Sequence, residues 1–366
     1  MKKIKVLMII PDLKAANGVT SYAMNYYKKL DHEKICMDFA IYSDELLVEA
    51  YKREIESVGG RIFVLPSFFS FNHYSTCKKI IKEGNYDIIH DNSLHITLPL
   101  MMAAKSAKIP VRVLHSHSSK LGETLLKKIR NRAFLPLLRC LVTDYAACSE
   151  IAGRALFGNK SFIVIPNVIN GEKYRFSVER RNYVRMKMNS TTKFVIISVG
   201  RLATEKNPFF AMDVIKESIK LDKNIEYWWV GDGPLYEQVQ KYAEKIGINE
   251  HVRFLGSRTD VNDLYQAADC FLLPSLFEGF SLVTVEAQTA GLPCVISEAI
   301  PQEVIFRNEV KRVSLEMNEK IWAQCICKNV KGFDRSDGYD FNPYLDINAG
   351  RFMQDYYSNR CKRNEE

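Results

Sequence analysis

Short apolar runs of strand length alternate with helical patterns along most of this chain. In the first half the apolar runs lie at residues 6–10, 39–42, 61–65, 88–90, 111–115, 144–148 and 163–165. The helical stretches between them include residues 19–30, 46–58, 74–83 and 94–107. Consecutive parallel strands need a long crossover connection, which is usually a helix. The alternation therefore predicts βαβ units and parallel sheets whose strands are buried on both faces.

A polar, basic stretch at residues 172–190 interrupts this alternation, which then resumes. The later strands are expected at residues 194–199, 227–230, 252–255, 270–273 and 295–297, and the later helices at residues 208–219, 235–246 and 261–268. A chain of 366 residues has the length of two ordinary domains. We therefore expect two doubly wound, Rossmann-like α/β domains facing a central cleft, at residues 1–172 and 173–345, with the interdomain linker inside the polar stretch. Ligands of such folds bind beyond the carboxyl ends of the strands.

The stretch PSLFEGFSLVTVEAQTAGLPCVISEA, residues 274–299, predicts a loop followed by a helix. Gly279 allows a tight backbone path, and Ser281 is a good candidate for the N-cap of the helix. Glu278 then lies just before the helix and Glu286 in its second turn. A helix N-terminus suits a phosphate, whereas a carboxylate beside it suits sugar hydroxyls. The combination of phosphate and hydroxyl groups favours a nucleotide sugar as the ligand.

Glu278 and Glu286, framed by SLFEGF and EAQTAGLP, resemble the E-x7-E signature of retaining glycosyltransferases of the GT-B fold, family 4 type, also called group 1. Segments of the first half resemble the polysaccharide-assembly branch of that family. The resemblance implies that Glu278 binds hydroxyls of the donor sugar, beside the backbone N–H groups of Gly279 and Phe280. It implies that Glu286 binds the ribose and that Ser281 belongs to the same donor site.

The segment GRLATEKNP, residues 200–208, resembles the G-R-x-x-x-x-K element of the family. The resemblance implies that Arg201 and Lys206 hold the donor diphosphate, together with the N–H groups of Leu282 and Val283. Fixed cations stabilise the charge that develops on a leaving nucleotide. No Asp-x-Asp, the metal-holding motif of the other main transferase fold, occurs in the sequence. We therefore expect no metal ion and no other cofactor.

Two segments of the first half also resemble the family. Residues 17–20, NGVT, lie where relatives often carry two glycines near the phosphates. Gly18 matches that pattern and Asn17 departs from it, so a bare loop glycine stays an equal alternative. Residues 111–118, VRVLHSHS, resemble an R-x-x-H-S-H segment. His115 matches the histidine that contacts the donor sugar in relatives, and His117 is expected on the acceptor side.

Positive charge is concentrated in the first half of the chain. Lys and Arg outnumber Asp and Glu by ten in residues 1–175, although the whole chain carries +8. Residues 120–139 mix apolar side chains with basic ones, among them Lys127, Lys128 and Arg130. Such a helix would lie on an anionic membrane beside a lipid-diphosphate acceptor, or it would be an ordinary helix with a solvated basic face; both interpretations stay open. Nucleic-acid binding would rest on the charge alone, and we do not expect it.

The N-terminus MKKIKVLMIIPD has an apolar run of strand length, which is too short for a secretory signal. No window of the sequence reaches the roughly 18 apolar residues of a transmembrane helix. The nine cysteines are scattered and predict free thiols in a reducing compartment. These features predict a cytoplasmic protein, with peripheral contact at the cytoplasmic face of the membrane as the alternative that the basic helix suggests.

By this resemblance we expect a metal-independent hexosyltransferase. It would move a hexose from a nucleotide sugar, UDP-linked, to a growing lipid-linked saccharide in the assembly of a capsule, an exopolysaccharide or another cell-surface glycan. The resemblance also implies that a helix within residues 346–366 crosses back to the first domain. A UDP-sugar epimerase of the same fold and a catalytically silent sugar-nucleotide-binding homologue remain alternatives. A dinucleotide-dependent oxidoreductase is disfavoured because no G-x-G-x-x-G follows the first strand.

Overall fold

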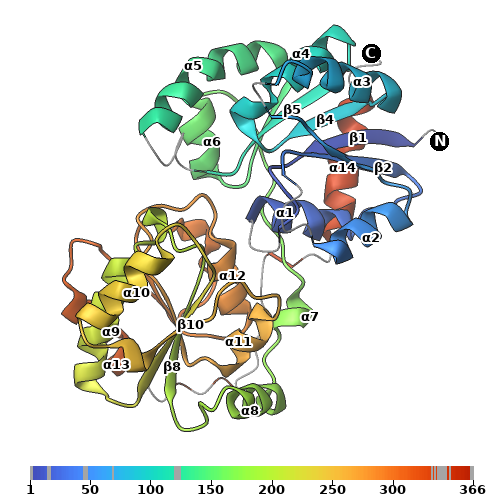
Figure 1. The fold of residues 1–366 in the computed structure, drawn as a ribbon. Helices are drawn as coiled ribbons and strands as arrows, with labels where there is room; N and C mark the ends of the chain where they lie inside the picture. The colour runs from blue at the N-terminus through green and yellow to red at the C-terminus, as the bar shows by residue number, and fades with distance from the viewer. Residues whose placement is uncertain are drawn as a thin grey trace. The chain divides into compact units, whose positions relative to one another are not determined.

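The computed structural model describes residues 3–14, 18–43, 48–67, 70–118, 125–330, 333, 335, 344–345 and 348–362. The chain divides into two compact units (Figure 1). Unit 1 comprises Met1–Val168 together with Leu345–Glu366, and unit 2 comprises Ile169–Tyr344. Each unit has its own parallel sheet and its own apolar core, so each is described separately.

Unit 1 contains a seven-stranded parallel sheet with the strand order β3-β2-β1-β4-β5-β6-β7. Its strands are β1 Ile4–Ile9, β2 Ile35–Ile41, β3 Ile62–Val64, β4 Ile88–Asp91, β5 Val111–Ser116, β6 Asp144–Ala147 and β7 Ile163–Val164. Its helices are α1 Gly18–Tyr27, α2 Glu49–Ser57, α3 His73–Gly84, α4 Leu98–Ser106, α5 Leu125–Leu141, α6 Glu150–Phe157 and α14 Ala349–Lys362, with a 3-10 turn at Leu94–Thr97. The strand order reverses between β1 and β4, which is where doubly wound sheets bind ligands.

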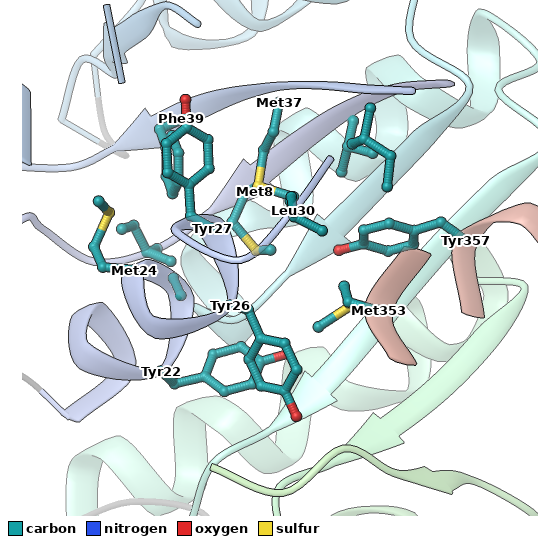
Figure 2. Close-up of a cluster of buried hydrophobic side chains, with 14 of the residues drawn as sticks. Met8, Tyr22, Met24, Tyr26, Tyr27, Leu30, Met37, Phe39, Met353 and Tyr357 are labelled. Carbon is teal, nitrogen blue, oxygen red and sulfur yellow. The ribbon is translucent and has the colours of Figure 1, made fainter. Parts of the chain in front are cut away.

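Helix α14, from the C-terminal end of the chain, packs into the core of unit 1 (Figure 1). Figure 2 shows Met353 and Tyr357 of α14 in the same apolar cluster as Tyr22 and Tyr26 of α1. The helix lies close to the end of α1, because a Cβ added at Gly350 would stand 1.7 Å from the carbonyl oxygen of Lys29. A glycine at this position is therefore needed for the close approach of α14 to the rest of unit 1.

Unit 2 contains a six-stranded parallel sheet with the strand order β10-β9-β8-β11-β12-β13. Its strands are β8 Phe194–Val199, β9 Ile225–Val230, β10 Val252–Phe254, β11 Cys270–Leu273, β12 Cys294–Ser297 and β13 Val310–Val313. Its helices are α7 Gly171–Tyr174, α8 Val178–Lys187, α9 Pro208–Leu221, α10 Tyr236–Lys245, α11 Val261–Ala267, α12 Leu282–Thr289 and α13 Glu319–Asn329. The reversal between β8 and β11 places the loops after these two strands side by side.

The prediction that the interdomain linker lies inside residues 172–190 is wrong. The units divide at Val168 and Ile169, and residues 171–187 form α7 and α8 within unit 2. Helix α8 is anchored by arginines rather than by an apolar stripe. Arg181 and Arg185 donate to the carbonyl of Ala267 at 3.1 and 2.8 Å, and both pair with Asp269. A polar, basic sequence therefore conceals a packed helix, because its buried face consists partly of paired guanidinium groups.

No helix among the described residues is long and apolar enough to cross a bilayer.

Candidate active site

The loops after β8 and β11 of unit 2 bring Lys206 and Glu278 together. The backbone N–H of Leu276 donates to the carbonyl of Glu205 at 2.8 Å, which ties one loop to the other. Lys206 Nζ lies 2.6 Å from Glu278 Oε1, and Ser275 Oγ donates to the same oxygen at 2.8 Å. The two charged side chains are only 15% and 12% exposed. The ion pair thus stands at the carboxyl ends of the central strands, where ligands of this kind of sheet bind.

Glycines after β8 and β9 allow the ends of these strands to approach each other. Gly200 has φ 154° and Gly231 has φ 130°. A Cβ added at Gly231 would lie 2.3 Å from the carbonyl oxygen of Gly200, and one at Gly200 would lie 3.0 Å from Lys206 Cε. A larger residue at either position would displace the β8 loop that carries Lys206 and Arg201. Arg201 itself is exposed, so the structure brings Lys206 but not Arg201 against Glu278.

Ser281 precedes α12 as expected, but it does not act as the predicted N-cap. Its hydroxyl lies 2.8 Å from Thr284 Oγ1 and makes no capping bond to a backbone N–H. Its backbone has φ 67°, a left-handed conformation that costs energy in a residue with a Cβ. The ring of Phe280 is buried and packs edge-on against Tyr344 at 5.0 Å. The strained residue of the loop is therefore the serine, and the predicted tight glycine, Gly279, has no positive φ.

Glu286 of α12 accepts hydrogen bonds from two tyrosines that sequence reasoning missed. Tyr174 OH donates to Oε1 at 2.8 Å, and Tyr265 OH shares its hydrogen between Oε2 at 3.3 Å and the carbonyl of Val283 at 3.2 Å. Loss of hydration raises the pKa of the Glu286 carboxyl to about 7, against the lowering effect of the two hydroxyls. Tyr174 lies on α7, and no local sequence motif identifies it as a partner of Glu286. The carboxylate is thus held at a fixed orientation on the first turns of α12.

His115 and His117 of unit 1 lie at the carboxyl end of β5, as the sequence predicts, and a third histidine joins them. His90, at the end of β4, places Nε2 2.9 Å from His115 Nδ1. The ring of His117 stacks on that of His115 with centroids 4.1 Å apart. Tyr22 OH of α1 lies 3.3 Å from His115 Nδ1. His90 was overlooked because it is the last residue but one of an apolar strand, DIIHDN, which reads as core.

Burial keeps this histidine cluster neutral. It lowers the pKa of His90 and of His117 to about 3, and burial with the two neighbouring imidazoles moves the pKa of His115 in the same direction. His115 is 2% exposed, and its Nε2 has no hydrogen-bond partner among the described residues. The cluster therefore contributes uncharged imidazoles to unit 1, in contrast to the ion pair of unit 2.

Comparison with known proteins identifies the family. The family model described as glycosyl transferases group 1 matches residues 180–323. The putative glycosyltransferase EpsF of Bacillus subtilis is 31% identical over 324 residues, which cover 85% of this chain and 84% of EpsF. This chain belongs to the group 1 glycosyltransferases. The UDP-Gal:alpha-D-GlcNAc-diphosphoundecaprenol alpha-1,3-galactosyltransferase of Escherichia coli is 29% identical over 66% of this chain and 65% of its own length.

The fold of this group 1 glycosyltransferase is the GT-B fold. Its structure matches that of Anabaena HepE, solved in complex with UDP and glucose, with a TM-score of 0.76. The match covers 98% of both chains at 19% sequence identity, so it speaks for the fold alone. Two Rossmann-like domains, as expected from the alternation of strands and helices, are therefore shown.

Two further predicted positions of the glycosyltransferase lie in unit 1. Gly18 is the exposed first residue of α1, and a Cβ added there would meet nothing within 4 Å. Packing thus does not require a glycine at this position, and its partner in the pattern, Asn17, lies outside the described residues. On α5, Arg130 is half-buried and donates to Asn131 Oδ1 at 3.2 Å. The side chains of Lys127 and Lys128 lie outside the described part.

Proposed function

We propose that this glycosyltransferase moves a hexosyl group from a UDP-sugar to a saccharide on a lipid diphosphate, with retention of anomeric configuration, in the assembly of a cell-surface glycan. The observation that carries the proposal is the partly buried ion pair of Lys206 and Glu278 at the carboxyl ends of β8 and β11. The E. coli relative is named for a UDP-linked donor and a diphosphoundecaprenol acceptor, and HepE was solved with UDP and glucose. Both names support this choice of substrates.

Lys206 and Arg201 supply the positive charge that the leaving UDP requires. Cleavage of the sugar–phosphate bond leaves negative charge on the β-phosphate, and a fixed cation stabilises it without reorganisation. Lys206 is held in place by Glu278, while the exposed Arg201 is able to grip phosphate oxygens with its planar fork. These two protein cations perform the role that a metal ion has in other transferases, so we propose a metal-independent reaction.

The start of α12 forms the remainder of the donor site. The amides of Leu282 and Val283 belong to the first turn, whose N–H groups have no partner within the helix and suit the diphosphate. The carboxylate of Glu278 accepts from sugar hydroxyls, beside the amides of Gly279 and Phe280. Glu286 accepts from the ribose hydroxyls. The leaving phosphate oxygen takes the proton of the attacking acceptor hydroxyl, so this reaction needs no protein base.

Helix α5 is the proposed membrane contact. Leu126, Ile129 and Leu137 are 80%, 59% and 54% exposed, and basic residues of the same helix flank them. Burial of this apolar face in the headgroup region, next to cationic side chains, would bring unit 1 to a lipid-linked acceptor. Replacement of Leu126 and Ile129 by Ser should abolish sedimentation with anionic vesicles. Leu221→Ser, at a leucine on α9 of unit 2 that is 55% exposed, should leave sedimentation unchanged.

A metal-free assay against a panel of UDP- and GDP-sugars tests the function. Released nucleotide and sugar products are scored in EDTA, with and without a lipid-linked saccharide. Release from one UDP-sugar that acceptor accelerates supports the proposal and names the donor. Interconversion of the donor sugar would replace the transferase with an epimerase. Tight UDP binding without turnover on any acceptor of the panel would favour a silent homologue.

A further inference from the structure

A hydrogen-bonded chain links the C-terminal helix to His115. Tyr357 OH of α14 lies 2.8 Å from His90 Nδ1, and His90 Nε2 lies 2.9 Å from His115 Nδ1. Tyr22 OH of α1 approaches the same His115 Nδ1 at 3.3 Å. Figure 2 shows the two tyrosines within the core of unit 1, on α1 and α14. All four side chains are at most 2% exposed, so water does not compete for these bonds.

Burial decides the direction of each bond in the chain. Among the described residues, the hydroxyl of Tyr357 is hydrogen-bonded to His90 Nδ1, and the hydroxyl of Tyr22 is hydrogen-bonded to His115 Nδ1. A hydroxyl carries one hydrogen, and a buried donor without an acceptor costs more than one hydrogen bond gains. Both tyrosines therefore donate, and His90 Nδ1 and His115 Nδ1 accept.

The remaining protons follow from the neutrality of the rings. A neutral imidazole has one N–H, so His90 carries its hydrogen on Nε2 and donates it to His115 Nδ1. The single lone pair of His115 Nδ1 receives this 2.9 Å bond and shares it with the longer, weaker bond from Tyr22 at 3.3 Å. His115 then carries its own hydrogen on Nε2, the atom that lacks a partner in the described structure. The reverse direction would leave two buried hydrogens unpaired, those of the Tyr357 and Tyr22 hydroxyls, whereas this direction leaves only the one on His115 Nε2. Burial lowers the pKa of both histidines, which agrees with neutral rings.

His117 fixes the plane of the His115 ring. The two rings are stacked at 4.1 Å with an angle of 26° between them. The amide nitrogen of Asn92 faces the carbonyls of Ile9 and His90 at 3.1 and 3.3 Å, so Asn92 Oδ1 is left to accept. It accepts from His117 Nε2 at 2.8 Å. His117 is thereby held by its own bond while it covers one face of His115.

We propose that Tyr357 and His90 are positioning residues that hold the proton of His115 on Nε2, so that His115 offers one neutral N–H to a ligand oxygen. That this oxygen belongs to the transferred sugar rests on the proposed function. We call the hydrogen-bonded series Tyr357–His90–His115 the relay. Its first member, Tyr357, comes from helix α14, which follows the whole of unit 2 in the sequence. These side-chain hydrogen bonds are not needed to hold β4 and β5 together, because the two strands are joined by their own backbone hydrogen bonds.

Nuclear magnetic resonance on full-length protein labelled with [15N]histidine tests the proton assignment without any substrate. Long-range proton–nitrogen correlations distinguish a ring nitrogen that bears hydrogen from one that does not. Replacement of single histidines assigns the signals. We expect His115 in the Nε2–H form, and Tyr357→Phe should populate the Nδ1–H form. Tyr356→Phe removes a neighbouring buried hydroxyl of α14 outside the relay and should leave the His115 signals unchanged.

Activity provides the second readout. Tyr357→Phe should lower kcat/KM about tenfold, the size of effect that outer-shell partners of a functional histidine have, while Tyr356→Phe should retain activity. His90→Gln should keep much of the activity, because its amide oxygen accepts from Tyr357 and its nitrogen donates to His115. His90→Leu, which has no donor, should lose activity as Tyr357→Phe does.

The outcomes separate this inference from the proposed function. An Nδ1–H tautomer of His115 in the unaltered protein, or His115 signals in Tyr357→Phe that match those in Tyr356→Phe, would overturn the relay. Equal kcat/KM for His90→Gln and His90→Leu would also overturn it. Absence of turnover with every nucleotide sugar would instead defeat the proposed function, and the resonance experiment would still decide the proton assignment.

Discussion

The two units carry chemically opposite clusters, each at the carboxyl ends of two neighbouring strands of its sheet. In unit 2, Lys206 and Glu278 form a charged pair on two loops, and Arg201, earlier in the loop that carries Lys206, is exposed. In unit 1, His90, His115 and His117 are uncharged at the ends of β4 and β5, where His90 and His115 are buried and His117 is half-buried. The same doubly wound topology thus presents a site for charge in one unit and a site for neutral hydrogen bonds in the other.

The difference follows from where each side chain starts. Lys206 and Glu278 come from loops beyond the strands, so their charges keep some hydration and gain a partner across 2.6 Å. The histidines begin on or directly after the strands themselves, where solvation of an imidazolium is lost and the neutral form is favoured. Under the proposed function, unit 2 would stabilise the charge of the leaving group and unit 1 would orient the sugar. Four variants test this division.

Lys206→Ala should have the largest effect. Loss of the cation beside the leaving diphosphate should reduce kcat by roughly a hundred- to a thousand-fold, as removal of one preorganised charge-stabilising group does. The free energy of unfolding should fall by about 1–3 kcal/mol, because Glu278 loses one charged partner, and the variant should remain folded at the assay temperature. Lys220→Ala removes an exposed lysine that pairs with Glu217 on α9 and should leave both measurements unaltered. Near-normal turnover of Lys206→Ala would refute the assignment of charge stabilisation to unit 2.

Glu286→Gln should weaken UDP binding about tenfold in isothermal titration calorimetry, because a charged acceptor of ribose hydroxyls becomes a neutral one. The single amide oxygen of Gln still accepts from Tyr174, and the hydroxyl of Tyr265 keeps the carbonyl of Val283, 3.2 Å away, as an acceptor, so the surroundings of the side chain are preserved. Glu217→Gln on α9 serves as the matched control. Unchanged UDP affinity in Glu286→Gln would remove the ribose from the proposed site.

His115→Phe should reduce kcat/KM about tenfold, the free energy of one neutral hydrogen bond at the upper end of its usual range. The effect should be smaller than that of Lys206→Ala, since no charge is lost. His73→Phe is the control, because His73 is a buried histidine of unit 1 that bonds the carbonyl of Pro66 at 2.7 Å, away from the cluster. Both variants should lower the unfolding temperature. A loss of activity as large as that of Lys206→Ala would mean that His115 handles charge.

The pH dependence of stability should have opposite signs for Glu286 of unit 2 and for His117 of unit 1. Glu286 has its pKa raised to about 7, so the folded state keeps a proton that the unfolded chain has lost above its ordinary pKa near 4.5. The unfolding free energy should therefore fall as pH rises from 4.5 to 7. His117 has its pKa lowered to about 3, so its contribution should be lost as pH falls from 6.5 towards 3.

Urea unfolding at pH 5 and at pH 8 measures this contrast. Relative to the unaltered protein, the unfolding free energy of Glu286→Gln should rise by about 1–2 kcal/mol from pH 5 to pH 8. That of His117→Gln should fall by a similar amount over the same range. Asp91, whose pKa burial raises to about 7, is common to all three proteins and cancels in the differences. The same dependence of unfolding free energy on pH in both variants would show that Glu286 and His117 do not differ in protonation as expected.

Most of the fold could be predicted because the evidence for it is local. The strands β8 and β11 coincide with their expected bounds, since each is a short apolar run between turn residues. Helix α8 was missed because paired arginines, instead of apolar residues, cover its buried face. Strand β13, which begins with Val310, was missed because its sequence VKRV alternates too briefly to distinguish an edge strand from a loop.

The candidate site divides in the same way. His115, Lys206, Glu278 and Glu286 stand in contiguous motifs, so the sequence alone was sufficient to name them. The partners that tune them stand elsewhere in the chain. Tyr174 lies 112 residues before Glu286, and Tyr357 lies 267 residues after His90. No local pattern marks such pairs.

By itself, the sequence determined that this protein is built from parallel α/β units and carries motifs that resemble those of group 1 glycosyltransferases, because periodicity and motif spacing are properties of neighbouring residues. The tertiary structure alone decided that Lys206 is paired with Glu278, that Ser281 takes the strained conformation before α12, and that α14 returns to place Tyr357 beside His90. Burial is the physical reason. Whether a charge is paired, a carboxyl holds its proton or an imidazole stays neutral depends on which distant segments exclude water from it.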